Sequence, residues 1–184
     1  MSAHKKTLAF RRLLIAHATF QKVASGCRAL RSFALKEDAD FYAPFFAGIC
    51  VTYIRPFRRA DGLGLLPQFF STFPPGSPHA QTHKDLEDGR DGAFAHYTPE
   101  QAAKLLPDVV RQDIQKKIQI LVRGGEFGYR APAVTWARDR LQTIDALALF
   151  QAERARAEAA KLFAHLAEGK KFPDGDYVLD ETFP

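Results

Sequence analysis

Two long stretches of helical hydrophobic periodicity constrain the fold more than any other feature of this sequence. Between Leu8 and Leu35, apolar residues recur every three or four positions, which is typical of an amphipathic helix. From Thr135 to Glu168 the sequence is rich in Ala, Leu, Gln, Glu and Arg, carries a second such stripe, and is followed by Gly169, a favourable helix stop. Long amphipathic helices bury their apolar stripes against other elements, so the pattern predicts a helical bundle.

The middle of the chain predicts further helices and one long connection. Phe41–Phe57 is apolar on nearly all sides, as expected of a central bundle helix, with Pro44 in its first turn and Pro56 at its end. Residues 61–78 contain many Gly and Pro together with three Phe, which predicts a loop that packs over the core or acts as a lid.

Two more helices are expected after that loop, over residues His79–Ala95 and 98–110. Residues 114–130 allow either a helix ended by a glycine pair or a small β-hairpin near 117–130. We therefore expect an all-α fold: one domain over residues 1–184 with about five helices and a bundle core over about 8–168. The tail 170–184 is expected to dock on the bundle or on a second subunit.

The net charge of +5 is distributed unevenly along the chain. Residues 1–60 contain eleven Lys and Arg against three Asp and Glu, a net of +8, and the remainder therefore carries −3. A cationic first third is expected either to form a solvated basic face or to contact an anionic partner such as nucleic acid.

No segment of the sequence predicts a membrane or secretory protein. The longest apolar stretch, Phe41–Ile54, is too short to cross a bilayer, and the basic start of the chain lacks the apolar core of a signal peptide. Cys27 and Cys50 lie in apolar helical surroundings without metal-site spacing, so two buried free thiols are expected. The expected location is the cytoplasm.

Polar residues of unusual chemistry gather on one face of the helix expected over His79–Ala95. At about 100° per residue, His79, His83, Arg90 and Tyr97 fall on one stripe with Leu86. Two imidazoles and a guanidinium on an inward face require partners or a cleft, because an unpaired buried charge is costly. The stripe is therefore a candidate site.

The segment from Arg90 to His96 resembles the R-x(4–6)-H motif of HEPN domains. Asp91 stands in the polar position that follows the arginine, and the motif lies near the end of a helix in an all-α chain, as in that family. The resemblance covers the bundle, roughly residues 8–165, at the level of architecture, and only the motif matches residue by residue.

The resemblance implies cleavage of RNA without a metal or other cofactor, by attack of a ribose 2′-OH on the adjacent phosphate. His96 would act as the base, Arg90 would bind the phosphate oxygens, and Asp91 would orient one of them. Arg90 and His96 lie about 120° apart on an ideal helix, and the family joins two motifs by dimerisation. The implied protein is a homodimeric, RNA-directed toxin or defence component with a possible cognate antitoxin.

Neighbouring residues have a structural and a functional interpretation. Arg55 is expected to pair with Asp85, Glu87 or Asp88 or to contact a second phosphate, and Arg58 is expected to be solvated or to contact the RNA backbone. Together with His79, His83 and Tyr97, these arginines are the candidate RNA- or substrate-binding residues.

Two further functions remain open on the sequence alone. One is a non-catalytic helical module that binds partner proteins, in which Arg90 and His96 have structural roles. The other is a metal-dependent helical-bundle enzyme. His79, His83 and Glu87 follow one another at intervals of four residues, which places all three on one helix face, as is typical of metal ligands on a helix. The H-E-x-x-H pattern of zinc proteases is absent.

Overall fold

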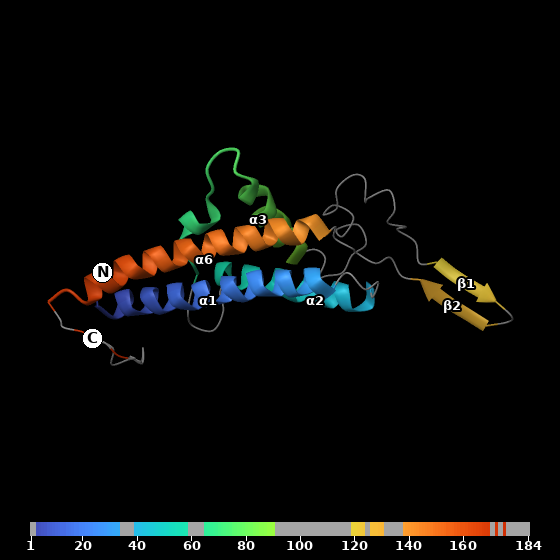
Figure 1. The fold of residues 1–184 in the computed structure, drawn as a ribbon, viewed down its shortest axis with the longest axis horizontal. Helices are drawn as coiled ribbons and strands as arrows, with labels where there is room; N and C mark the ends of the chain where they lie inside the picture. The colour runs from blue at the N-terminus through green and yellow to red at the C-terminus, as the bar shows by residue number, and fades with distance from the viewer. Residues whose placement is uncertain are drawn as a thin grey trace.

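The structure is a computed structural model. It describes residues 3–33, 39–58, 65–90, 119–123, 126–130 and 138–169, together with Phe172 and Gly175. Within these residues it contains four α-helices, and Figure 1 shows the two longest, α1 (Ala3–Phe33) and α6 (Arg138–Leu166), side by side along most of their length. They run antiparallel, since Phe10 near the start of α1 meets Phe163 near the end of α6, with ring centroids 5.9 Å apart.

The predicted hydrophobic stripes of these two helices form the centre of the core. Residues of α1 and α6 at helical spacing are buried against each other, which confirms the periodicity in both stretches. Gly169 follows α6 with a φ of 74°, a conformation that glycine adopts without steric cost, so it ends the helix as expected.

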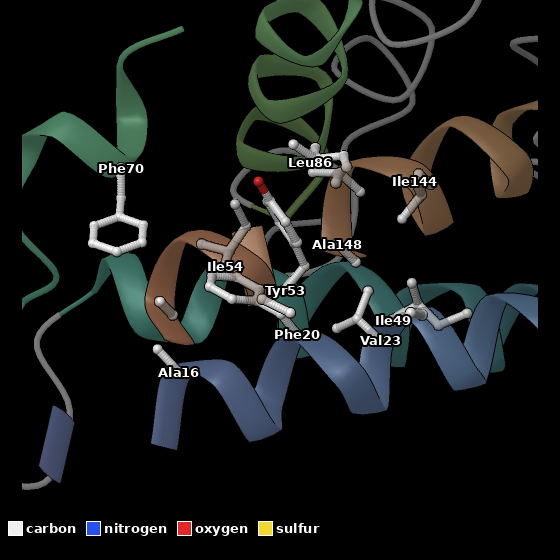
Figure 2. Packing of buried hydrophobic residues seen from close by; sticks show 14 of the residues in the cluster. Ala16, Phe20, Val23, Ile49, Tyr53, Ile54, Phe70, Leu86, Ile144 and Ala148 are labelled. Atoms are coloured by element: carbon white, nitrogen blue, oxygen red, sulfur yellow. The ribbon is translucent and has the colours of Figure 1, made fainter. Parts of the chain in front are cut away.

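Helix α2 (Ala39–Ile54) is the third member of the bundle and packs against α1. It begins at Ala39, which places Pro44 one turn further into the helix than the predicted first turn. After Ile54 the chain continues as a 3₁₀ turn, η1 (Arg55–Phe57), that contains Pro56. Tyr53 and Ile54 are fully buried, and Figure 2 shows both between α1 and α6.

The described part of the predicted loop over 61–78 packs on the core. Its short 3₁₀ helix, η2 (Gln68–Ser71), buries Phe70 completely (Figure 2). Helix α3 (Pro78–Asp88) follows, and the Ser77 side chain caps it by accepting a hydrogen bond from the backbone N–H of His79.

Helix α3 is shorter than the helix predicted over His79–Ala95. Its α-helical part ends at Asp88, and Gly89 and Arg90 form a wider π-helical turn. Gly89 is a poor helix former, which explains a change of geometry at this position. Residues 91–118, which include the predicted helix over 98–110, lie outside the described residues.

Of the two alternatives for residues 114–130, a helix or a hairpin, the described residues show the hairpin. Strands β1 (Gln119–Arg123) and β2 (Glu126–Arg130) pair antiparallel, with Gln119 opposite Arg130 and Arg123 opposite Glu126. Figure 1 shows the hairpin beyond the end of the helices, apart from the bundle.

The described residues thus form an all-α helical bundle with an added hairpin, with four α-helices where about five were expected. Of the tail 170–184, the structure describes only Phe172, whose ring lies 5.4 Å from that of Phe163 on α6, and Gly175. Among the described helices, none combines the length and the apolar character that a membrane crossing needs.

Candidate functional site

Two ion pairs hold α3, the helix that leads to the candidate motif. Asp85 accepts a hydrogen bond from Arg140 of α6 at 2.6 Å, and Glu87 accepts one from Arg58 at 3.1 Å. Leu86, between the two carboxylates, is fully buried (Figure 2). The end of α3 is therefore fixed to α6 and to the residue that follows η1.

Arg90 is half-buried and directly follows this anchored helix, in the π-helical turn. The other predicted residues of the motif, Asp91 and His96, lie outside the described residues, as does Tyr97. The structure thus places the arginine of the motif beside the bundle. The distance and orientation of Arg90 relative to His96 stay a prediction.

Arg58 binds one of the carboxylates that were considered as partners for Arg55. Its Nη2 lies 3.1 Å from Glu87 Oε1 and its side chain is 39% exposed, while Arg55 is exposed at the start of η1. A 3₁₀ turn advances about 120° per residue instead of 100°, so the arginines after Ile54 point in directions that a continued α-helix would not give.

His83 occupies an aromatic pocket in the core. Its Nδ1 lies 2.9 Å from the hydroxyl oxygen of Tyr53 on α2, and its ring meets those of Tyr53, Phe57 and Phe73 with centroids 4.7–5.7 Å apart. Figure 2 shows the Tyr53 side chain directed from α2 toward α3. Burial lowers the pKa of His83, and the nearby charge of Glu87 opposes this effect in part.

The Tyr53 hydroxyl and His83 Nδ1 form a buried hydrogen bond in which the imidazole tautomer determines which group donates. Burial raises the pKa of Tyr53 far above its usual value, so its hydroxyl keeps its proton. A hydrogen bond with the Gln151 side chain of α6 opposes this effect in part. The hydroxyl of Tyr53 thus has polar neighbours on both α3 and α6.

His79 lies one turn before His83 and has a different environment. It is half-buried, and its ring stacks on that of Phe150 from α6, with centroids 4.7 Å apart and an interplanar angle of 25°. The described residues, which include His79, His83 and Glu87, contain no group of three His, Cys, Asp or Glu side chains arranged to hold a metal ion.

Arg154 and Gln151 of α6 bind the backbone of η2. Gln151 Nε2 donates to the Phe70 carbonyl at 2.8 Å, and Arg154 Nη2 donates to the Phe69 carbonyl at 2.7 Å. The Arg154 guanidinium also lies over four aromatic rings at 5.1–6.0 Å from their centroids, namely those of Phe69, Phe70, Phe73 and Phe150. Burial lowers the pKa of Arg154.

The sequence did not identify Tyr53, Gln151 or Arg154 as site residues. Tyr53 is the only residue between Phe46 and Ile54 with a ring hydroxyl, and Gln151 is a polar residue on a buried stripe of α6. A polar group at a core position requires a partner, and that signal was available in the sequence.

Comparison with known proteins adds no constraint on the site. No family model matches the chain, and neither the curated proteins nor the solved structures give a significant match.

Proposed function

We propose that this chain is a HEPN-like endoribonuclease that cleaves RNA without a metal, with Arg90 and His96 as catalytic residues and Asp91 as their positioning residue. The observation that supports this proposal is the place of Arg90. It follows a helix that two ion pairs hold to the bundle, so its backbone is fixed while its side chain is partly accessible. Stabilising a charged transition state requires such a pre-positioned cation.

The proposed reaction uses the ribose as its own nucleophile. His96 accepts the proton of a 2′-OH, the 2′-oxygen attacks the adjacent phosphorus, and the 5′-oxygen leaves with a proton from an acid. Arg90 binds the phosphate oxygens, whose negative charge increases in the transition state. The products carry a 2′,3′-cyclic phosphate and a 5′-hydroxyl.

The active form in this proposal is a homodimer. Arg90 and His96 would diverge by about 120° if one helix carried both, so two chains are needed to complete a site. An enzyme that cleaves cellular RNA would suit a toxin or defence component, with a cognate antitoxin as a partner protein.

Cleavage of mixed RNA by the purified protein in EDTA tests the proposal. We expect Arg90→Ala and His96→Ala each to reduce cleavage by at least about 10²-fold, the usual contribution of a positioned acid–base or charged group. Arg156→Ala is the matched control, because the side chain of this arginine on α6 is 71% exposed and its contact with Glu153 is a long one, 4.0 Å, at the surface. Cleavage that survives both site substitutions would overturn the assignment.

One observation favours a second candidate, a non-catalytic module that binds a protein partner. An open groove of about 500 Å³ lies between α1 and α2, lined by residues that include Val23, Gly26, Phe45 and Ile49. Phe45 is 63% exposed there. A second copy of the chain is the occupant we expect, because each copy presents both the exposed Phe45 ring and the largely apolar groove beside it, which a two-fold contact can pair. Phe45→Ser should then shift the chain toward the monomer in sedimentation analysis, and no RNA cleavage should be seen in EDTA.

A further inference from the structure

Aromatic rings and a cation share one surface where η2, α3 and α6 meet. We call this surface the Arg154 platform, and it consists of Phe69, Phe73, His79, Phe150 and Arg154. Phe69 is 43% exposed and the other four are half-buried. Two stretches that are distant in the sequence, 69–79 and 150–154, thus present adjacent ring systems near the surface.

The rings of the platform are held in place by contacts within the bundle. Phe150 lies between His79, with centroids 4.7 Å apart, and Phe73, with centroids 6.3 Å apart. The Arg154 guanidinium lies 5.6 Å from the centroid of Phe69 and 5.3 Å from that of Phe150. A ligand that stacks here would meet ordered rings and lose little affinity to their ordering.

Arg154 keeps hydrogen-bonding capacity beyond its role in binding η2. Nη1 donates to the Phe70 carbonyl and to Gln151 Oε1, and Nη2 donates to the Phe69 carbonyl. A guanidinium has five N–H groups, so Nε–H and one Nη2–H remain without an acceptor in the described residues. The nearby carboxylate of Glu158 is bound by Lys161 at 2.6 Å.

We propose that the Arg154 platform binds an unpaired RNA base by stacking, with the remaining N–H groups of Arg154 on the adjoining phosphate. Unpaired bases stack on aromatic side chains, and arginine adds both a planar stacking partner and a phosphate donor. The inference rests on the proposed function, because it names the form of RNA that this enzyme takes: single-stranded.

The platform is separated from the proposed catalytic residues. His79 is at the start of α3 and Arg90 follows its end, so the two are about 16 Å apart at 1.5 Å per residue. A base held on the platform therefore flanks the cleaved bond. Losing this contact should raise KM and leave kcat nearly unchanged, because the contact is the same in the ground state and in the transition state.

Fluorescence anisotropy with a labelled oligouridine tests the platform in the full-length protein. We expect Phe69→Ala to weaken binding by about 5–150-fold, the range for loss of one stacked base. Phe69→Trp should restore or strengthen binding. The matched control is Phe163→Ala, because Phe163 is a phenylalanine of similar exposure, 37%, near the other end of α6. The slope of affinity against salt should not change, since Phe69 carries no charge.

Four results test this inference, and the last two separate it from the proposed function. Equal affinities for Phe69→Ala and Phe163→Ala would overturn the platform, as would an equal loss of affinity for an RNA duplex. If His96→Ala abolishes cleavage while Phe69→Ala leaves KM unchanged, the platform is wrong and the function stands. If Phe69→Ala weakens oligouridine binding in a protein that does not cleave RNA, the platform stands and the proposed catalysis is refuted.

Discussion

Removing one buried hydroxyl, with Tyr53→Phe, tests how α3 is held on the bundle. Tyr53 is fully buried and its hydroxyl is hydrogen-bonded to His83 Nδ1 at 2.9 Å. The substitution keeps the ring and its contacts with Phe20 and Phe57, whose centroids are 5.5 and 5.6 Å away. It therefore removes the hydrogen bond with almost no change in volume.

The expected loss follows from the imidazole that remains. Without the hydroxyl, His83 Nδ1 loses this partner in a pocket where the residue is only 7% exposed. Leaving a buried donor or acceptor unsatisfied costs about 1–3 kcal/mol. Tyr53→Leu should cost more, about 3–5 kcal/mol, because it also leaves a cavity between the helices.

Urea denaturation followed by far-UV circular dichroism measures this loss. A lower midpoint with an unchanged m-value shows a change in stability alone. For a chain of this length each kcal/mol corresponds to about 2–4 °C in the melting temperature. The control is Thr143→Ala, which removes the hydroxyl that donates to the Arg140 carbonyl at the exposed surface of α6, and its effect should stay within about 0.5 kcal/mol.

A double-mutant cycle decides whether the pair itself is responsible. If the bond matters, the effects of Tyr53→Phe and His83→Leu will differ from additivity by more than about 0.5 kcal/mol. Additive effects, or a stability for Tyr53→Phe equal to that of the wild type, would refute the hydrogen-bond account of α3.

Three further predictions follow from the described residues. Burial lowers the pKa of His83 in the folded state, so the stability that the neutral imidazole contributes is complete above the unfolded pKa of 6.5 and is lost as pH falls through the folded pKa. His83→Gln should therefore make the urea midpoint less dependent on pH below 6.5. An unchanged dependence on pH in that range would argue against this. Gly48→Ala should raise the free energy of unfolding by roughly 0.5–1 kcal/mol, because the added methyl on α2 meets no atom within 4 Å, and a lower urea midpoint would disprove this. Burial raises the pKa of Cys27 to about 12 and that of Cys50 strongly, so both thiols should resist Ellman's reagent until the chain is denatured, and rapid labelling of the native protein would contradict their burial.

The bundle could be predicted from the sequence because its helices are set by local periodicity. The stripes of α1 and α6 specify which faces are buried, whatever their partners are. The ends of elements were less predictable, since α3 changes geometry at Gly89 and α2 gives way to a 3₁₀ turn at Arg55. A tighter turn redirects every later side chain, and this is why Arg58 reaches Glu87.

The partners of the candidate site residues could not be predicted, because they come from distant parts of the chain. His83 was recognised as an inward histidine, yet its hydrogen-bond partner, Tyr53, is 30 residues earlier on another helix. Arg154 reaches carbonyls 84 and 85 positions away. Such contacts depend on how the helices pack, and a single sequence does not specify that packing.

The central claim is that Arg90 and His96 cleave RNA through the ribose 2′-OH without a metal. Its most direct test is end-group analysis of RNA cleaved in EDTA, compared with an oligonucleotide that carries a 2′-deoxy sugar at the cleaved position. We predict a 2′,3′-cyclic phosphate on the RNA product, no cleavage at the deoxy position, and no cleavage by His96→Ala. Cleavage at the deoxy position, or products with a 5′-phosphate, would contradict the account.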